Sequence, residues 1–241
     1  MSHTPLPLLQ REMVKYLARV DRKGWVANHD GNASIKLSGN RFLITPTAFS
    51  KANINEQDLL VINHRKQVLQ GPHRPFSELS MHFAAYQARP DAKAVLHAHC
   101  PESIALSMLG HEIMPTMIAE AVVSLGDRIP TIGYFFPGSE EGLKDLGELL
   151  AYYDVVVLGN HGVISVGDDM EQAFLRMELC EHLAGIQRRT LTVGYPTTIP
   201  EEDIVRLLHK RKKAGLGPES RGLDLPGSGP DLVGPCSGPI G

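Results

Sequence analysis

The sequence has few cysteines, no long apolar run and no excess of positive charge. Its 241 residues include only three cysteines, Cys100, Cys180 and Cys236, and their spacing forms no disulfide framework. Scattered cysteines are typical of a reducing compartment, so we expect no disulfides and a cytoplasmic protein. No segment approaches the roughly 20 apolar residues that span a bilayer, and the N-terminus lacks the apolar stretch of a signal peptide. We therefore expect no membrane contact.

The charge balance lacks the strong positive field that favours polyanionic partners. The chain carries 24 Lys and Arg residues against 27 Asp and Glu residues, which gives a formal net charge of −3. Nucleic acids and anionic membrane surfaces are attracted by clustered positive charge, so neither is expected as a partner. A small-molecule substrate is the better expectation.

Helix and strand patterns alternate along the chain. Apolar residues at helical spacing, with Gly, Pro and Ser at the boundaries, predict helices over residues 9–23, 78–88, 101–110, 139–153, 168–191 and 201–214. Runs rich in β-forming residues predict strands within 30–37, 41–47, 58–62, 92–99, 128–135 and 154–167, with a break at 159–162 in the last. Ser77 is the expected N-cap of the second helix, which places Glu78 in its first turn.

These elements predict one α/β or α+β domain, in which a sheet is covered by helices. The length and the 42% hydrophobic content are sufficient for a single sizeable core. Residues 216–241 are rich in Gly and Pro and have no hydrophobic period. We therefore expect a domain over residues 1–215 followed by a flexible tail.

Two histidines stand one residue apart in the apolar run VLHAHC. Because residues i and i+2 of a strand point to the same side, His97 and His99 are expected to present both imidazoles to one place, as metal chelation requires. His161, at the break before Gly162, is the leading third ligand, and Glu78 is the leading carboxylate. A pair of this kind also occurs in packed cores, where one imidazole is only a hydrogen-bonded buried side chain. By itself the pair leaves both interpretations open.

Two other metal-binding classes fit the neighbouring residues poorly. Metallo-β-lactamase-like hydrolases need an aspartate two positions after the second histidine, where this chain has Pro101. Amidohydrolase barrels carry the pair near the start of a longer chain. Cys100 is interpreted as a small apolar filler, since no base is placed to activate it as a nucleophile.

Four blocks, DGNASIK, LITPT, PFSELSMHFAAYQARPDAKAVLHAH and LGNHGVISVG, occur in the order and approximate spacing of the class II aldolase/adducin family. The chain resembles that family over roughly residues 8–215. The resemblance implies a three-layer α/β/α domain with a central, mainly antiparallel sheet, and a homotetramer with active sites between subunits. It also implies a divalent metal, most often Zn²⁺ with Mn²⁺, Co²⁺ or Fe²⁺ as alternatives. The implied ligands are His97, His99 and His161, with Glu78 as an acid/base that can also touch the metal.

The implied reaction is carbon–carbon bond cleavage through a metal-stabilised enolate, either decarboxylation of a hydroxylated, possibly aromatic acid or aldol cleavage. The sugar-phosphate aldolases of the family hold phosphate with Gly-Asn, Thr-Gly and Ser-Ser pairs. This chain keeps Gly31 and Asn32, but it has Thr47 followed by an alanine, and Phe76 in front of Ser77. Phe76 replaces a hydroxyl donor with an aromatic face that could stack on a planar ligand.

Several alternatives follow from the same resemblance. His29 and Lys51 are candidates for binding a substrate carboxylate, although Lys51 has the alternative interpretation of an ordinary exposed lysine. Tyr134 and Tyr195 are weak substitutes for the tyrosine that family aldolases take from a neighbouring subunit. A sugar-phosphate aldolase, epimerase or dehydratase is the alternative within the enzyme class. An adducin-like interaction module and an Fe(II)-dependent oxygenase are the alternatives outside it.

Overall fold

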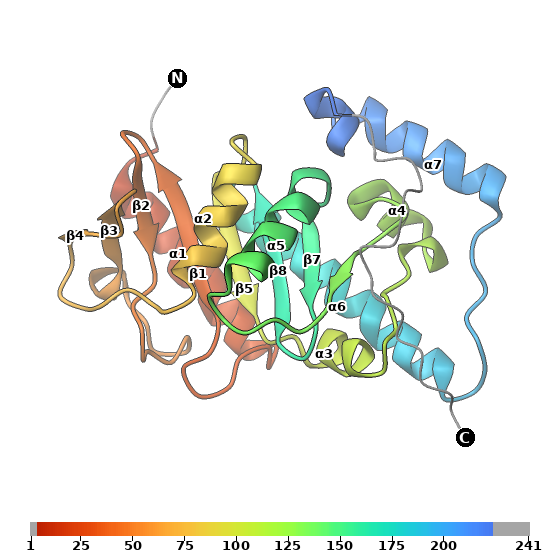
Figure 1. Cartoon of the computed structure of the whole chain (residues 1–241), viewed down its shortest axis with the longest axis horizontal. Helices are drawn as coiled ribbons and strands as arrows, with labels where there is room; N and C mark the ends of the chain where they lie inside the picture. Colours follow the sequence, from red (N-terminus) through yellow and green to blue (C-terminus); the bar gives the residue numbers. More distant parts are fainter. Residues whose placement is uncertain (1–3, 224–241) are drawn as a thin grey trace.

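An eight-stranded sheet runs through the middle of the molecule, and helices cover both of its faces (Figure 1). The structure is a computed structural model and describes residues 4–223. In spatial order the strands are β4 (Val68–Gln70), β3 (Leu60–Asn63), β2 (Arg41–Ile44), β1 (Asn32–Leu37), β5 (Ala94–Ala98), β8 (Gly162–Gly167), β7 (Val155–Leu158) and β6 (Thr131–Ile132). Neighbouring strands are antiparallel except β6 and β7, which are parallel. The three-layer, mainly antiparallel fold is thus confirmed.

The helices divide between the two faces of the sheet. One face is covered by α1 (Leu6–Arg22), α3 (Pro101–Met108), α4 (Ala119–Leu125) and α6 (Met170–Leu191), and the other by α2 (Leu79–Ala88) and α5 (Glu140–Tyr152). Helix α7 (Glu201–Lys213) packs on α4. Three short 3₁₀ segments span Glu56–Asp58, Pro115–Met117 and Pro218–Arg221. Since both faces are covered, strands such as β7 are continuous apolar runs and do not alternate.

Two separate apolar cores hold these layers together. In the larger core the side chain of Phe174 on α6 lies 5.3 Å from Tyr16 of α1 and 5.6 Å from the stacked ring of Trp25, measured between ring centroids. The second core joins α2 and α5 to the opposite face of the sheet. Cys100 and Cys180 are buried in the first core and form no disulfide within the part of the chain that the structure describes, and Cys236 lies outside that part. The interpretation of Cys100 as an apolar filler therefore agrees with its place in the fold.

Three boundaries differ from the sequence predictions. Helix α2 begins at Leu79 with Glu78 in the N-cap position and no side-chain cap, so Ser77 is not its cap. The strand expected over residues 128–135 is reduced to Thr131–Ile132, because the chain leaves the sheet at Gly133. In the predicted tail, residues 218–221 form a 3₁₀ helix with Pro218 buried, and residues 224–241 lie outside the described part of the chain.

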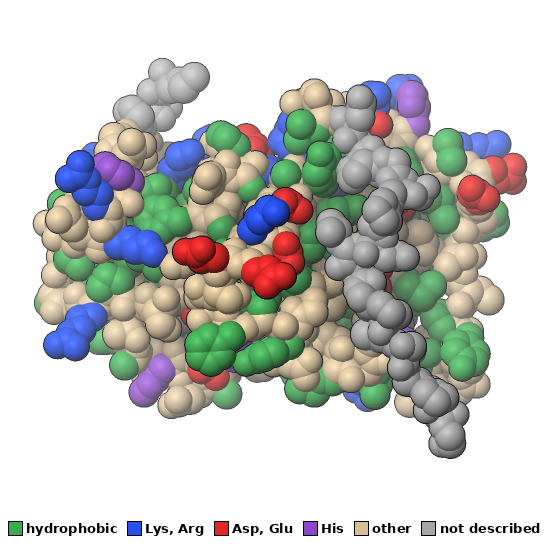
Figure 2. All heavy atoms as spheres, viewed as in Figure 1, with side chains coloured by type: hydrophobic (Ala, Val, Ile, Leu, Met, Phe, Trp, Pro, Cys, Tyr) green, Lys and Arg blue, Asp and Glu red, His purple; other side chains and the backbone are tan. Residues whose placement is uncertain are grey.

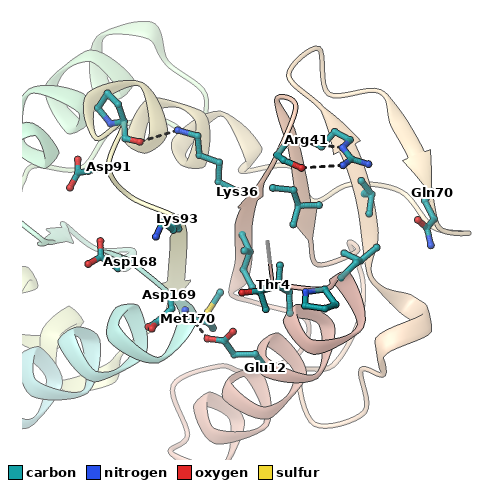
Figure 3. A pocket seen from close by; sticks show the side chains of 18 residues that line it. Thr4, Glu12, Lys36, Arg41, Gln70, Asp91, Lys93, Asp168, Asp169 and Met170 are labelled. Atoms are coloured by element: carbon teal, nitrogen blue, oxygen red, sulfur yellow. Dashed lines mark hydrogen bonds between the residues drawn. The ribbon is translucent and has the colours of Figure 1, made fainter. Parts of the chain in front are cut away.

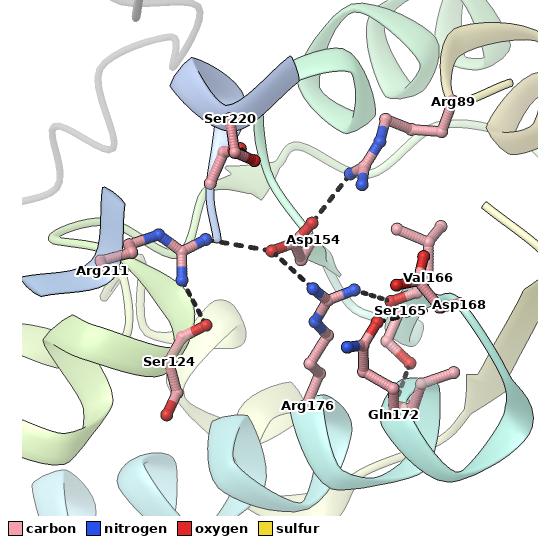
Figure 4. A network of polar contacts seen from close by, with 12 residues as sticks. Arg89, Ser124, Asp154, Ser165, Val166, Asp168, Gln172, Arg176, Arg211 and Ser220 are labelled. Atoms are coloured by element: carbon pink, nitrogen blue, oxygen red, sulfur yellow. Dashed lines mark hydrogen bonds and ion pairs between the residues drawn. The ribbon is translucent and has the colours of Figure 1, made fainter. Parts of the chain in front are cut away.

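A buried carboxylate ties the C-terminal elements to the sheet (Figure 4). Asp154 accepts hydrogen bonds from Arg89 at 2.8 Å and Arg211 at 3.0 Å, and it lies 3.2 Å from Arg176. Arg221 of the last 3₁₀ segment is 3.8 Å away. Burial alone would raise the pKa of Asp154, but the surrounding guanidinium groups lower it below its ordinary value. One carboxylate thus joins β7 to α6, α7 and the end of the described chain.

The surface carries charges of both signs. On the face shown in Figure 2, acidic side chains gather over α5 with a basic side chain beside them, and other Lys and Arg side chains are scattered over the surface. Within residues 4–223, none of the helices combines the length and apolar character needed to cross a membrane.

Candidate metal centre

Three imidazoles meet at one end of the central strands. His97 is the fourth residue of β5, His99 lies just beyond the end of that strand, and His161 occupies the turn between β7 and β8. The ring centroids are 4.8–5.2 Å apart, and one potential ligand atom from each residue lies within 4.8 Å of the others. Although β5 ends before His99, the two rings of the motif still converge as predicted. The structure therefore brings together the three ligands chosen from the sequence.

In two of these rings, His97 and His99, the Nε2 atom is left available to bind a metal. His97 Nδ1 lies 3.0 Å from the carbonyl oxygen of Val163, so it donates there and the lone pair of the neutral ring is on Nε2. The Nε2 atoms of His97 and His99 are both buried and find no hydrogen-bond partner among residues 4–223. Burial lowers the pKa of His97 to about 3, and burial also lowers the pKa of His99. Both rings are thus neutral at neutral pH, which is the state that binds metals.

Glu78 supplies a carboxylate to the same place from the start of α2. Its Oε1 lies 2.8 Å from His161 Nε2, and its Oε2 lies 3.6 Å from His97 Nε2. The side-chain amide of Asn32 donates to Oε2 at 2.8 Å. Burial by itself would raise the pKa of Glu78, but the hydrogen bond from His161 and the nearby His97 lower it below its ordinary value. The carboxylate is therefore ionised and can act as a metal ligand or as a base.

Two glycines allow the backbone to approach the centre closely. A Cβ atom on Gly162 would collide with the carbonyl oxygen of Ala98 and would lie 3.1 Å from His97 Cε1. Gly31 has a φ of +72°, and a Cβ there would lie 2.6 Å from Val26 Cγ1. Both positions therefore require glycine, because a Cβ atom would collide with a neighbouring atom. Since glycine has no side chain, Gly31 can act in the site only through its backbone.

A cavity of about 340 Å³ opens beside Glu78 and His99. It is lined by Gly31, Asn32, Thr47, Phe76 and Ser77, which are the five predicted substrate-binding residues, together with His29, Asp30, Pro46 and Ala48. Phe76 is only 7% exposed, and its ring packs edge-on against the buried ring of His82 at 4.9 Å. Only a small part of Phe76 is exposed, so its stacking on a planar ligand stays a prediction.

Lys51 does not face this cavity. It is 2% exposed, and its ammonium donates to the carbonyl oxygens of His29 at 3.0 Å and Phe49 at 2.7 Å. Neither predicted role, carboxylate binding or an ordinary exposed lysine, fits these contacts. Burial lowers the pKa of Lys51 to about 8. Lys51 braces the two loops that form the cavity wall, while His29 remains on the lining.

A larger cavity, of about 890 Å³, lies at the opposite end of the sheet (Figure 3). Its lining comes from α1, the end of β1 and the start of α6, and it includes Lys36, Lys93, Asp91 and Asp168. It contains none of the three histidines. Size alone would select this cavity, but two of the candidate site residues, Glu78 and His99, line the smaller one.

Sequence reasoning missed two polar neighbours of the centre. Asp30 Oδ2 lies 3.5 Å from His99 Nδ1, which places a carboxylate behind a candidate metal ligand. His82 is fully buried and contacts Asn32, the partner of Glu78. His82 follows Glu78 by four residues, so helical spacing alone could have placed both side chains on one face of α2.

The fold and this arrangement define the class of protein. Residues 11–188 match the family described as the Class II Aldolase and Adducin N-terminal domain. Because this match covers more than half of the 241 residues, the chain belongs to that family.

Individual relatives span most of the chain. An L-fuculose phosphate aldolase from Methanococcus maripaludis is 33% identical over 165 residues, covering 68% of this chain and 87% of the relative. A 3-oxo-tetronate 4-phosphate decarboxylase from Escherichia coli strain CFT073 is 30% identical over 180 residues, covering 73% and 84%. The crystal structure of YgbL from Escherichia coli has a TM-score of 0.78 and 26% identity, covering 84% of this chain and 99% of YgbL.

Proposed function

We propose that this protein is a divalent-metal-dependent carbon–carbon lyase that works through an enolate. The observation that carries the proposal is the convergence of His97, His99 and His161 beside the ionised carboxylate of Glu78. The similarity to an aldolase and to a decarboxylase supports it, since both reactions break a carbon–carbon bond and leave a carbanion that must be stabilised.

The residues present suit a metal. Two buried imidazole nitrogens without partners would be costly in an apolar interior, and a cation would satisfy them. Three imidazoles and one carboxylate form a donor set typical of Zn²⁺, and Mn²⁺, Co²⁺ and Fe²⁺ accept similar ligands. When bound, the ion would supply positive charge that stabilises an oxygen-centred anion of the substrate. His97, His99 and His161 would hold it, with Glu78 in reach.

Glu78 would move the proton. In the retro-aldol direction an enolate is left when the aldehyde departs, and in decarboxylation it is left when carbon dioxide departs. Both enolates take up a proton at carbon. In the retro-aldol direction the ionised Glu78 would first accept the proton of the substrate hydroxyl that becomes the aldehyde carbonyl, and would then give it to the enolate carbon; after decarboxylation the proton would come from solvent through Glu78. In the reverse direction the ionised carboxylate accepts the same proton, and the C–H electron pair passes into the enolate. Both candidate reactions therefore use the same residue in the same role.

The substrate proposed is a small hydroxylated acid or hydroxyketone. The cavity volume suits a molecule of that size, and Gly31, Thr47 and Ser77 line it, so a phosphate remains compatible with the site. The buried position of Phe76 favours an aliphatic substrate over an aromatic one. An interaction module alone would have no use for the three converging imidazoles. Consumption of oxygen by the Fe(II)-loaded protein would reveal the oxygenase alternative.

Metal analysis tests the first part of this proposal. The purified protein should bind about one zinc ion per chain after reconstitution, as measured by elemental analysis. His97→Ala and His161→Ala should lose that zinc, whereas His64→Ala, which changes an exposed histidine, should retain it. Loss of zinc in His64→Ala alone, or full retention in both site variants, would contradict the assignment.

Hydrogen exchange tests the second part. Dihydroxyacetone phosphate is a suitable probe because it carries adjacent carbonyl and hydroxyl oxygens and a carbon-bound proton next to the carbonyl. The zinc-loaded protein should replace that proton with deuterium in D₂O, as followed by NMR, and Glu78→Gln should not. With a 3-oxo acid, release of carbon dioxide would identify decarboxylation; with a ketose phosphate, release of an aldehyde would identify aldol cleavage. A zinc-loaded protein that exchanges no proton would refute the enolate chemistry.

We also propose that the chain assembles as a homotetramer with active sites between subunits. Tyr134 and Phe136 are 65% and 74% exposed in the segment after β6, and the backbone of Gly133 and Tyr134 lies against Gly159, two residues before His161. Exposed aromatic side chains beside a site favour a protein interface there. Light scattering should give the mass of four chains, and a monomer at micromolar concentration would contradict this assembly.

A further inference from the structure

A line of buried hydrogen bonds leads from the candidate base into the layer between the sheet and α2. Asn32 Nδ2 donates to Glu78 Oε2 at 2.8 Å, and Asn32 Oδ1 lies 2.6 Å from His82 Nε2. His82 Nδ1 lies 2.7 Å from Ser34 Oγ. The hydroxyl of Tyr86 is 2.9 Å from Ser34 Oγ and 3.0 Å from the carbonyl oxygen of Ser34.

Two structural periods generate this line. Asn32 and Ser34 are two residues apart on β1, so their side chains share one face of the sheet. Glu78, His82 and Tyr86 are four residues apart, so they follow one face of α2. Where these two faces meet, polar side chains from α2 and from β1 follow one another in turn along the line of hydrogen bonds. The line therefore depends on how α2 is placed over β1.

The donor and acceptor of each hydrogen bond can be assigned. An ionised Glu78 only accepts, so Asn32 must turn its NH₂ group towards Glu78 and its oxygen towards His82. His82 Nε2 must then donate. Burial lowers the pKa of His82 to about 3, so the ring is neutral and its Nδ1 accepts from Ser34 Oγ. The single hydroxyl proton of Tyr86 is directed at Ser34, whose carbonyl oxygen lies 3.0 Å and whose Oγ lies 2.9 Å from the Tyr86 oxygen; from Ser34 Oγ onward the line runs in a single sense towards the carboxylate.

The residues behind Asn32 cannot touch a substrate in the described cavity. Ser34, His82 and Tyr86 are buried and are not among the residues that line it. A series of hydrogen bonds that served only to satisfy buried polar groups could have any donor or acceptor as its last member. This line ends at the side chain proposed to carry the proton, and it fixes the amide orientation that this side chain needs.

We propose that His82, supported by Ser34 and Tyr86, positions Glu78 by locking the orientation of the Asn32 amide. His82 is a positioning residue and takes no proton itself. This inference rests on the proposed function only for its catalytic consequence. The geometric part, that Glu78 is held through Asn32 by His82, can be tested without a substrate.

The main comparison is between two substitutions of His82. His82→Leu removes the donor to Asn32, whereas His82→Gln can place an N–H near the position of Nε2. In His82→Leu we expect kcat for deuterium exchange into dihydroxyacetone phosphate to fall by about tenfold or more. The KM and the zinc content should stay near those of the wild type, because the three histidines that would hold the metal and the residues that line the cavity are not substituted. His82→Gln should recover most of kcat.

Two further variants guard against a folding defect in His82→Leu. Ser34→Ala removes the donor to His82 Nδ1, and Tyr86→Phe removes only the outermost hydroxyl. Both should lower kcat in the same direction, with a smaller effect for Tyr86→Phe, and zinc binding should again be retained. A purely structural role would instead lower the stability of all variants without separating kcat from KM and without rescue by glutamine.

Two substrate-free measurements complete the test. Nitrogen-15 NMR of the zinc-bound protein should show His82 neutral and protonated on Nε2. A crystal structure of zinc-bound His82→Leu, or of Ser34→Ala if the former does not fold, should show Glu78 displaced from its contact with Asn32. A protonated Nδ1, an undisplaced Glu78 or an unchanged kcat would overturn the inference. If the wild type exchanges no proton, the proposed function fails, and the crystal structure still decides whether His82 positions Glu78.

Discussion

Replacement of Asp154 by asparagine should be among the most destabilising single changes in this chain. Asp154 is 1% exposed, and it is the shared partner of three guanidinium groups at 2.8, 3.0 and 3.2 Å. Asparagine has nearly the same shape but no charge. The variant would therefore leave those cations buried around a neutral amide, with Asp91 as the remaining partner of Arg89.

The matched control fixes the scale of this effect. Asp91 pairs with Arg89 at 2.8 Å, but its side chain is 41% exposed. Removing one partner of a buried ion pair costs about 3–5 kcal/mol, whereas an exposed pair contributes at most about 1 kcal/mol. We therefore expect Asp154→Asn to lower the free energy of unfolding by about 3–5 kcal/mol, and Asp91→Asn by about 1 kcal/mol or less.

The assay is urea denaturation at one fixed protein concentration, followed by the fluorescence of the single tryptophan, Trp25, which is buried against Phe174. The folded-state pKa of Asp154 is below its ordinary value of 3.8. Its contribution to stability is therefore complete above that pH and is lost as the pH falls through the lower, folded-state pKa. The free energies of unfolding of the wild type and of Asp154→Asn, plotted against pH, should differ fully at neutral pH and converge only below pH 3.8. A loss in Asp154→Asn no larger than in Asp91→Asn would refute the reasoning.

Three further predictions concern the cavity wall and the metal centre. Ala48 has a φ of +59°, which disfavours a residue with a Cβ, so Ala48→Gly should raise the free energy of unfolding by about 1 kcal/mol; Ala52→Gly, outside that conformation, should not. Gly162→Ala should force β8 away from Ala98, lower stability by about 1–3 kcal/mol and weaken zinc binding in a calorimetric titration, and unchanged affinity would contradict this account. The pKa of Lys51 is lowered to about 8 from 10.5, so the unfolded chain binds more protons between those values and the wild type should gain stability there; Lys51→Met should lack this gain in parallel urea titrations.

The sequence was a good guide to elements whose cause is local. Asp169, at the start of the helix predicted over residues 168–191, caps α6 by accepting from the amide of Gln172, and Pro101 begins α3. Such features depend on a few neighbouring residues, so they can be identified from the chain alone. The strand expected over residues 128–135 was mostly wrong, because continued pairing depends on a neighbouring strand and not on β-propensity.

In the candidate site, too, the features with a local cause could be predicted from sequence, and the contacts between distant segments could not. His97, His99, His161 and Glu78 could be chosen from sequence, because the motif and the family blocks mark each of them. The antiparallel register that sets Asn32 opposite His97 could not be read from either strand, and neither could the position of α2 over β1 that brings His82 to Asn32. The interpretation of Lys51 as an exposed lysine was wrong, and the substrate-binding role of Phe76 stays a prediction; the exposure of both side chains depends on loops that are remote in sequence.

By itself, therefore, the sequence determined which side chains are candidates for the chemistry, since motif spacing is a local property, and the resemblance of its motif blocks to a known family implied the kind of sheet that presents them. Only the tertiary structure decided which polar faces meet: Asn32 with His82 behind the base, Asp30 behind His99, and the arginines around Asp154. A periodic pattern specifies the face of an element on which a residue lies. The partner of that face is decided when the elements pack, because burial then requires each polar group to find a donor or an acceptor.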